Sequence, residues 1–150
     1  MGANSKISVQ ILRRWAAPDR PFSARWERLG GVELPPITMF TPTSTAGCVA
    51  ALPGIVRRTL CHGANTLLTE FRLQSGSTLP AHHHPQEQTG YLISGHLRLR
   101  IGDREHDVRP GDAWCIPANV EHQASILEDS VALEVFSPVR TDYLPPTPSA

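Results

Sequence analysis

Short segments in which apolar and polar residues alternate dominate the middle of the chain. The segments 65–74 (NTLLTEFRLQ), 96–101 (HLRLRI) and 130–137 (SVALEVFS) show this alternation, which places apolar side chains on one face of a β-strand. Turn residues separate the segments, as at Gly102 and in the sequence Pro110-Gly-Asp. Strands that recur every ~8–12 residues with turns between them are typical of β-sandwiches and β-barrels. No long segment repeats at the helical period, so the pattern predicts an all-β fold.

Two proline-rich flanks bracket this region. Residues 18–53 contain PDRPF, ELPPITMFTPTSTAG and ALPG, which favour extended or loop structure because proline fixes φ and removes a donor. Residues 7–16 (ISVQILRRWA) fit a short helix or a strand, and the end of the chain is rich in Pro, Thr and Ser. We therefore expect an N-terminal extension or arm over residues 1–54, one domain over 55–144 and a disordered tail over 145–150.

Length and charge limit the possible partners. A chain of 150 residues fits a single domain with one substantial core. The 14 basic and 14 acidic residues cancel, so no nucleic-acid or anionic-membrane surface is expected. No apolar run approaches the ~18 residues of a membrane helix, and the first 20 residues do not have the pattern of a secretory signal. Cys48, Cys61 and Cys115 are odd in number and widely spaced, which predicts reduced thiols and a cytoplasmic location.

The segment HHHPQEQTGYLISG (residues 82–95) carries the first candidate chemistry. On a strand, His82 and His84 project to the same side while His83 points away. A third donor from the neighbouring strand and a fourth from His122 would complete a metal site. Imidazole with oxygen suits Zn, Ni, Fe, Mn or Cu. Because the imidazoles must be neutral, metal binding should weaken below roughly pH 6.

The spacing around these histidines is more specific than the histidines alone. The first block reads Gly76, five residues, His82-x-His84, three residues, Gln88, six residues, Gly95. The second reads Gly111, five residues, Pro117-x-Asn119, two residues, His122. These spacings resemble the two motifs of the cupin superfamily, small β-barrels of jelly-roll type. The resemblance implies a cupin barrel over residues 55–144, with two histidines and a carboxylate from the first motif and one histidine from the second.

One position departs from the common cupin pattern. Most cupins have glutamate where this chain has Gln88, and Glu87 lies one residue away. A one-residue offset on a strand reverses the direction of the side chain, so Gln88 is favoured as the ligand unless the turn at Pro85 alters the register. Three neutral imidazoles and an amide leave a divalent ion its full charge, which favours Lewis-acid chemistry on a carbonyl or hydroxyl.

Residues 67–144 resemble one subgroup more closely, the pectin- and alginate-degradation cupins that linearise 4,5-unsaturated uronates. The segments that carry the resemblance are HHHPQEQTGYLISG, RPGDAWCIPANVEH and LEVFSPVRTDYL. In that subgroup His, His, Gln and His hold the metal, which implies His82, His84, Gln88 and His122 here.

The same subgroup has the pattern D-V-F-S/T-P-x-R near its end, matched here by Glu134, Phe136 and Arg140. Glu134 and Phe136 are two apart and share one strand face. If that face lines the barrel, Glu134 can move a proton between oxygen and carbon, Arg140 can hold the uronate carboxylate and Phe136 can pack against the sugar ring. Glutamate in place of aspartate lengthens the acid by one methylene (~1.5 Å), a displacement to which catalysis is sensitive.

These observations favour a metal-dependent isomerase that opens and tautomerises an unsaturated uronate or a related small sugar acid. The alternatives are an iron-dependent cupin dioxygenase and a binding module that holds a metal and a sugar acid without turnover. A sulfonium lyase is disfavoured because Gly90 stands where those enzymes have a tyrosine. Barrels of this family often dimerise, so a homodimer is expected. Four apolar residues of the extension would pack on the partner or on their own barrel: Trp15, Phe22, Trp26 and Met39.

Overall fold

The computed structural model describes residues 28–29, 32–33, 40–44 and 47–144. Most of the predicted extension, including the four apolar residues named above, and the predicted tail lie outside the described residues. The strands are β1 (Arg28–Leu29), β2 (Val32–Glu33), β3 (Cys48–Leu52), β4 (Ile55–His62), β5 (Leu67–Leu73), β6 (Thr78–His82), β7 (Glu87–Ile101), β8 (Arg104–Val108), β9 (Ala113–Ile116) and β10 (His122–Ser137), and the 3₁₀ helix η1 spans Thr141–Tyr143.

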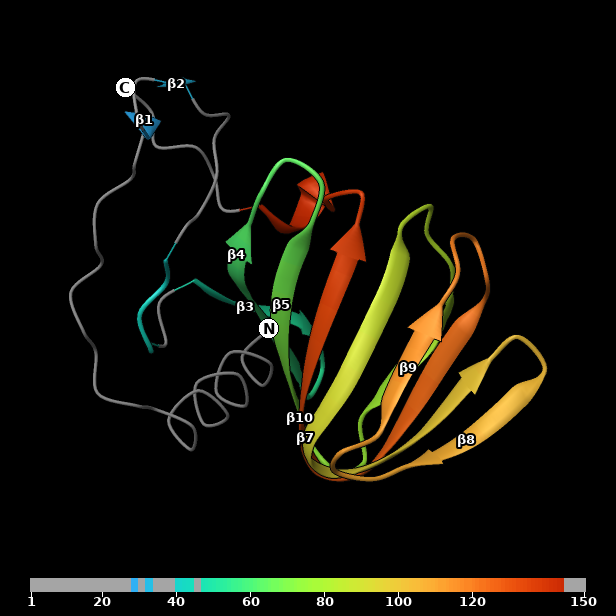
Figure 1. The fold of residues 1–150 in the computed structure, drawn as a ribbon. Coiled ribbons are helices and arrows are strands. Elements are labelled where there is room, and N and C mark those ends of the chain that lie inside the picture. Colours follow the sequence, from blue (N-terminus) through green and yellow to red (C-terminus); the bar gives the residue numbers. More distant parts are fainter. Residues whose placement is uncertain (1–27, 30–31, 34–39, 45–46, 145–150) are drawn as a thin grey trace, which may run out of the picture.

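Strands β3 to β10 form one antiparallel sheet that folds on itself as a jelly-roll barrel (Figure 1). Its order is β3-β4-β5-β10-β7-β8, with β6 also beside β10 and β9 beside β7. The predicted all-β fold is therefore confirmed. Among the described residues η1 is the only helix, and none is long and apolar enough to cross a membrane. Strand β3 pairs with β4 although its residues were assigned to the extension, so the sheet begins at Cys48.

Two long strands, β7 and β10, connect the two layers of the barrel. The first part of β7 pairs with β9 and its last part with β8. The first part of β10 pairs with β6 and its last part with β5. Both strands bend where Gly95, at a φ of +93°, meets the fully buried Ser130. A Cβ on Gly95 would lie 2.2 Å from Ser130 Oγ, so only glycine fits this bend.

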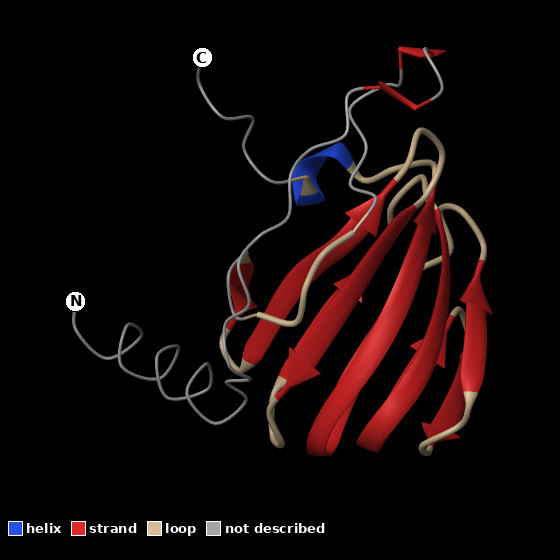
Figure 2. Cartoon of the chain, turned by 60° about the vertical axis from the view of Figure 1, so that its left-hand side comes forward, coloured by secondary structure: helices blue, strands red, loops and turns tan. Residues whose placement is uncertain are grey.

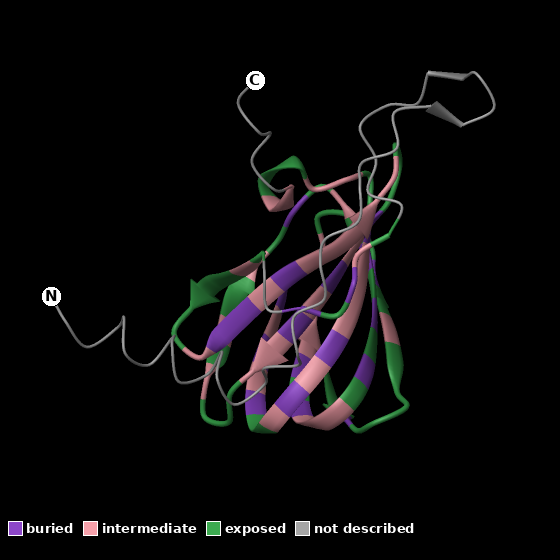
Figure 3. Ribbon diagram, turned by 90° about the vertical axis from the view of Figure 1, so that its left-hand side faces the viewer, coloured by how far each residue is buried: buried purple, intermediate pink, exposed green. Residues whose placement is uncertain are grey.

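Alternation along the strands separates the inside of the barrel from the outside, as the striped burial in Figure 3 shows. On β7, Gln88, Gly90 and Leu92 are buried while Glu87 and Tyr91 are exposed. Most of the buried apolar side chains belong to two clusters. One contains Leu92, Leu97, Leu99, Val108, Ala124, Ile126 and Ala132, and the other contains Ile55, Leu67, Phe71 and Phe136. Leu73 and Leu79 pack against both clusters.

The helix η1 follows β10 and lies at the end of the barrel where β10 ends and β5 begins (Figure 2). Phe136, near the end of β10, pairs with Leu67, the first residue of β5. Tyr143 and Leu144 pack against the second core cluster. The C-terminal part of the described chain thereby covers one end of the barrel interior.

Candidate metal centre and cavity

Three histidines from different parts of the chain meet inside the barrel. His82 ends β6, His122 begins β10, and the two residues are paired across the strands. His84 follows β6 in a loop, so the predicted strand does not extend through both histidines of the His-x-His motif. The possible ligand atoms of His82, His84 and His122 nevertheless lie within 4.8 Å of one another, and His83 is exposed.

A second loop fixes the position of His84. The backbone N–H of Asn119 donates a hydrogen bond of 2.8 Å to the carbonyl of His84. Asn119 adopts a φ of 62°, a left-handed conformation that asparagine tolerates better than most residues. The two motifs recognised in the sequence are thus joined directly at the site.

Each of the three imidazoles is oriented by a backbone carbonyl. The Nδ1 atoms of His82, His84 and His122 lie 2.9, 3.0 and 2.9 Å from the carbonyl oxygens of Pro80, Gln86 and Val120, in that order. A carbonyl only accepts, so Nδ1 carries a proton, and in a neutral ring Nε2 then keeps a lone pair. The Nε2 atom of His122 is buried and has no hydrogen-bond partner among the described residues. Metal-ligating histidines have this same arrangement of a bonded Nδ1–H and a free Nε2.

The surroundings keep two of the imidazoles neutral. Burial lowers the pKa of His122 to about 4, against the opposing hydrogen bond to Val120, and His82, His84 and Arg140 add repulsion to its charged form. Burial also lowers the pKa of His84. Near pH 7 both rings therefore offer lone pairs, which is the form that binds a metal.

Gln88 adds an amide oxygen to this set. It is 4% exposed, whereas Glu87 faces outward, as the alternation predicted. The Oε1 atom of Gln88 lies 2.9 Å from Nε2 of His84, and its amide group hydrogen-bonds to Glu134. A carboxylate only accepts, so the NH₂ group faces Glu134 and the oxygen faces His84.

Two lone-pair atoms, Gln88 Oε1 and His84 Nε2, therefore face each other at hydrogen-bond distance. Two ligands at right angles on one ion, with bonds of about 2.1 Å, lie about 3 Å apart. A divalent cation between these atoms would relieve their repulsion. The donor set of three imidazoles and one amide oxygen fits a first-row transition metal.

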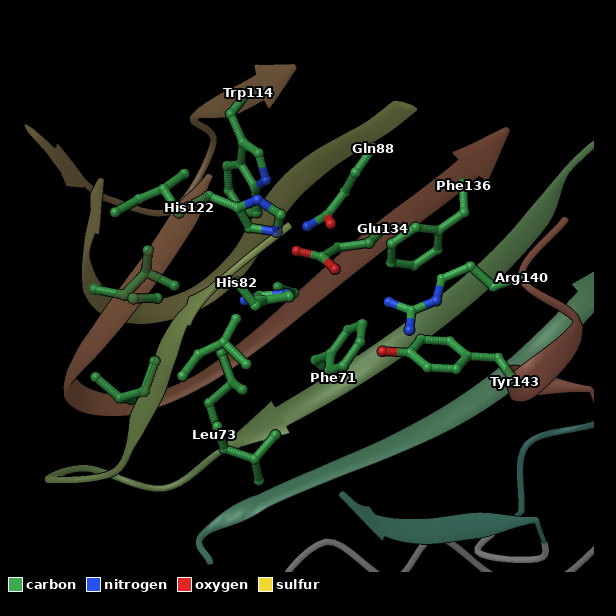
Figure 4. Close-up of a pocket in the computed structure, with 17 residues that line it drawn as sticks. Phe71, Leu73, His82, Gln88, Trp114, His122, Glu134, Phe136, Arg140 and Tyr143 are labelled. Carbon is green, nitrogen blue, oxygen red and sulfur yellow. The ribbon is translucent and has the colours of Figure 1, made fainter. Parts of the chain in front are cut away.

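Glu134 lies on the same inner face of β10 as Phe136 and lines the cavity (Figure 4). Burial raises the pKa of Glu134 to about 7, while the hydrogen bond from Gln88 and the charge of Arg140 lower it. The side chain is only half-buried. A carboxyl group with this pKa can both accept and return a proton near neutral pH.

Phe136 and Arg140 complete the set that the sequence named. Phe136 is 1% exposed, and its ring lies edge-on to that of His84 with centroids 5.6 Å apart. Arg140 follows β10, lines the cavity and places its Cζ 5.5 Å from the centre of the Phe136 ring. One edge of its guanidinium pairs with Asp142, with Nη2 and Oδ2 2.7 Å apart. Six of the seven predicted residues thus line one cavity, and the seventh, His84, contacts Gln88 and Phe136 of its lining.

Three aromatic residues of the cavity were missed from the sequence: Phe71, Trp114 and Tyr143. Trp114 lies over Gly90, where an added Cβ would come within 2.1 Å of the indole. Trp114 occupies the space of a side chain at position 90, and its inward direction follows from the alternation in β9. The cavity has a volume of about 50 Å³.

The class of the domain follows from the fold, the two motifs and comparison with known families. Residues 69–138 match the cupin domain family, and the barrel described above has the fold of that family.

Particular relatives are similar over most of their own length. The chain is 27% identical over 93 residues to the pectin degradation protein KdgF of Dickeya dadantii strain 3937, covering 61% of this chain and 84% of that protein. Among solved structures, KdgF from a Halomonas species aligns with a TM-score of 0.63 and 29% identity, covering 65% of this chain and 92% of the other. An RmlC-like cupin from Shewanella frigidimarina aligns with a TM-score of 0.68 and 20% identity over 71% and 96% of the two chains, and shares the fold.

Proposed function

We propose that this protein is a metal-dependent cupin enzyme that opens and tautomerises the ring of a 4,5-unsaturated uronate. The observation that carries the proposal is the convergence of three imidazoles and the Gln88 oxygen beside a carboxyl group, Glu134, whose pKa is about 7. The similarity to KdgF, a pectin degradation protein, supports a sugar acid derived from pectin as the substrate.

The metal would be held by His82, His84, Gln88 and His122. When bound, a divalent ion supplies Lewis acidity that stabilises negative charge on a substrate oxygen. Because no carboxylate belongs to this ligand set, the bound ion would keep its full charge. Gln88 would have a second role, because its NH₂ group hydrogen-bonds to the Glu134 carboxyl and holds it next to the ligand set.

Glu134 is proposed to carry the proton of the reaction. In an unsaturated uronate the ring oxygen joins C1 to the alkene carbon C5. The Glu134 carboxylate accepts the proton of the C1 hydroxyl, the bond between C1 and the ring oxygen breaks, and C1 becomes an aldehyde. The released oxygen is then an enolate on C5, and Glu134 returns the proton to C4 to give the C5 ketone. One proton moves from O1 to C4 and no other reactant is required.

Arg140 and Phe136 are proposed to orient the sugar. Asp142 occupies one edge of the Arg140 guanidinium, and the remaining N–H groups can bind the substrate carboxylate. Phe136 offers a buried apolar face next to His84. Binding the carboxylate at Arg140 would keep the reacting carbons near Glu134, and such positioning contributes strongly to rate.

The test is to incubate metal-loaded protein with unsaturated galacturonate released by a pectate lyase. The ultraviolet absorbance of the conjugated double bond should fall faster than in a blank, which reports the spontaneous reaction. Zn, Ni, Fe, Mn and Cu should each be loaded in turn. Absence of acceleration with every metal would exclude the proposed reaction, and retained binding of the sugar acid would then indicate a binding module.

A further inference from the structure

Tyr143 closes one end of the cavity and has no part in the reaction described so far. It is the last residue of η1 and lines the cavity, and Figure 4 shows its phenol reaching inward. Within the described part of the chain, its hydroxyl has no hydrogen-bond partner. A donor without a partner at the edge of a cavity is available to a ligand.

The ring of Tyr143 lies between two guanidinium groups. The Cζ atoms of Arg57 and Arg140 lie 3.8 and 3.9 Å from its centre. Both guanidinium groups lie over the ring of Tyr143. Two planar groups so close to the ring centre would overlap if they lay on the same face of the ring, so they lie on opposite faces. Arg140 lines the cavity, whereas Arg57 is absent from the lining. Arg57 therefore supports the outer face of the ring, at a distance typical of cation–π contact.

Strand β4 also fixes the backbone of η1. Thr59 Oγ1 donates a hydrogen bond of 2.7 Å to the carbonyl of Tyr143. Arg57 Nη2 donates one of 3.3 Å to the carbonyl of Asp142. The position of the phenol is thus set by the side of the barrel as well as by the chain that follows β10.

We propose that Tyr143 is a substrate-binding residue whose hydroxyl donates a hydrogen bond to the carboxylate of a sugar acid held by Arg140, and that Arg57 is a positioning residue acting through Tyr143. The inference rests on the proposed function, because it uses the same ligand. Burial raises the pKa of Tyr143, although the two arginines lower it, so the phenol remains a donor at neutral pH. The hydroxyl and the guanidinium together would recognise a carboxylate more selectively than either group alone.

The chain offers a matched control, since Tyr91 is its only other tyrosine and is exposed on the outer face of β7. Tyr143→Phe removes the hydroxyl and retains the ring between the two arginines, and Tyr91→Phe makes the same change away from the cavity. We expect Tyr143→Phe to raise KM by about tenfold or more, the loss expected for a hydrogen bond to a charged group, with a much smaller change in kcat. Thermal unfolding of both variants checks that each is folded.

Binding of saturated galacturonate, measured by calorimetry on the same metal-loaded proteins, separates this inference from the proposed reaction. Weaker binding by Tyr143→Phe than by Tyr91→Phe supports the inference even if the wild type has no turnover. Equal KM and equal binding for the two variants overturn the inference and leave an observed turnover intact. Wild-type protein that binds no galacturonate also overturns it.

A double-mutant cycle tests Arg57. If Arg57 acts through the phenol, Arg57→Gln raises KM in the wild-type background and has little further effect in the Tyr143→Phe background. Arg98→Gln is the matched control, because Arg98 is an exposed arginine of β7 paired with Glu105. Effects that simply add in the two backgrounds would show that Arg57 does not act through the Tyr143 hydroxyl.

Discussion

At the scale of single residues, Glu134 is the acidic group of the cavity lining among the described residues. Its environment combines burial, which favours the neutral acid, with Gln88 and Arg140, which favour the carboxylate. The balance gives a pKa of about 7, so both protonation states are populated at neutral pH. Both are required if one group is to accept a proton and then return it.

Glu134→Gln should lower kcat by about 10²–10⁴-fold, the range for a general acid–base group, and leave metal content unchanged. Initial rates and elemental analysis measure the two effects. Glu87→Gln is the control, because Glu87 is an exposed neighbour of Gln88 on the other face of β7. A kcat for Glu134→Gln within a few-fold of the Glu87→Gln value would remove Glu134 from the mechanism.

The histidine run contains its own comparison. His84→Ala removes a proposed ligand with a lowered pKa, whereas His83→Ala changes an exposed neighbour. We expect metal affinity to fall by about 100-fold or more in His84→Ala, since even outer partners of a metal site affect affinity by 10–100-fold, and to stay near wild type in His83→Ala. Similar losses in both variants, measured by competition with a chelator, would contradict the ligand assignment.

At the scale of elements, the bend shared by β7 and β10 brings the two motifs together. Gly95 meets Ser130 there, and the Ser130 hydroxyl accepts a hydrogen bond of 3.0 Å from the N–H of His96 and donates one of 2.7 Å to the carbonyl of Glu128. Several register shifts in β10 lie in this region. The bend lets each strand contribute to both layers and thereby brings His82 of β6, Gln88 of β7 and His122 of β10 close together.

Gly95→Ala should therefore destabilise the protein by about 3 kcal/mol, from a strained positive φ together with the steric conflict at Ser130. Urea denaturation measures this change. Gly63→Ala is the control, since an added Cβ at Gly63 meets nothing within 4 Å. If the two variants unfold at the same urea concentration, the bend does not depend on Gly95 as described.

At the scale of the whole molecule, two buried groups oppose each other in their effect on stability. His122 has a folded pKa of about 4 against an ordinary value of 6.5, so the unfolded chain binds more protons between these values and stability falls as pH falls. Glu134 has a folded pKa of about 7 against 4.5, so the folded protein binds more protons and stability falls as pH rises. The two effects overlap between about pH 4.5 and 6.5.

Replacing Glu134 should reveal how His122 alone makes the free energy of unfolding depend on pH. In metal-free protein, Glu134→Gln should lose stability more steeply than the wild type as pH falls from 6.5 to 4.5, because the opposing group is gone. The free energy of unfolding at several pH values in the presence of a chelator measures this slope. If the free energy of unfolding changed with pH in the same way in both proteins, burial would not raise the pKa of Glu134 as described.

The sequence predicted the barrel, because strand periodicity determines it, and the two motif spacings predicted that His82, His84 and His122 would lie close together. Alternation directed Gln88 inward and Glu87 outward, and the motif spacings identified His122. Alternation could not show that His84 lies beyond the end of β6. No sequence period relates Arg57 to Tyr143, since a tertiary contact between β4 and η1 joins them. The homodimer and the cytoplasmic location stay predictions.

The proposed function requires that four side chains hold one ion inside the barrel. Diffraction at the absorption edge of the bound metal, from crystals grown with Ni or Zn, would locate that ion. We predict a single anomalous peak about 2.1 Å from Nε2 of His82, His84 and His122, with Gln88 Oε1 beside it. A well-occupied metal elsewhere with no peak among these atoms, or no peak in crystals of metal-saturated protein, would contradict the claim.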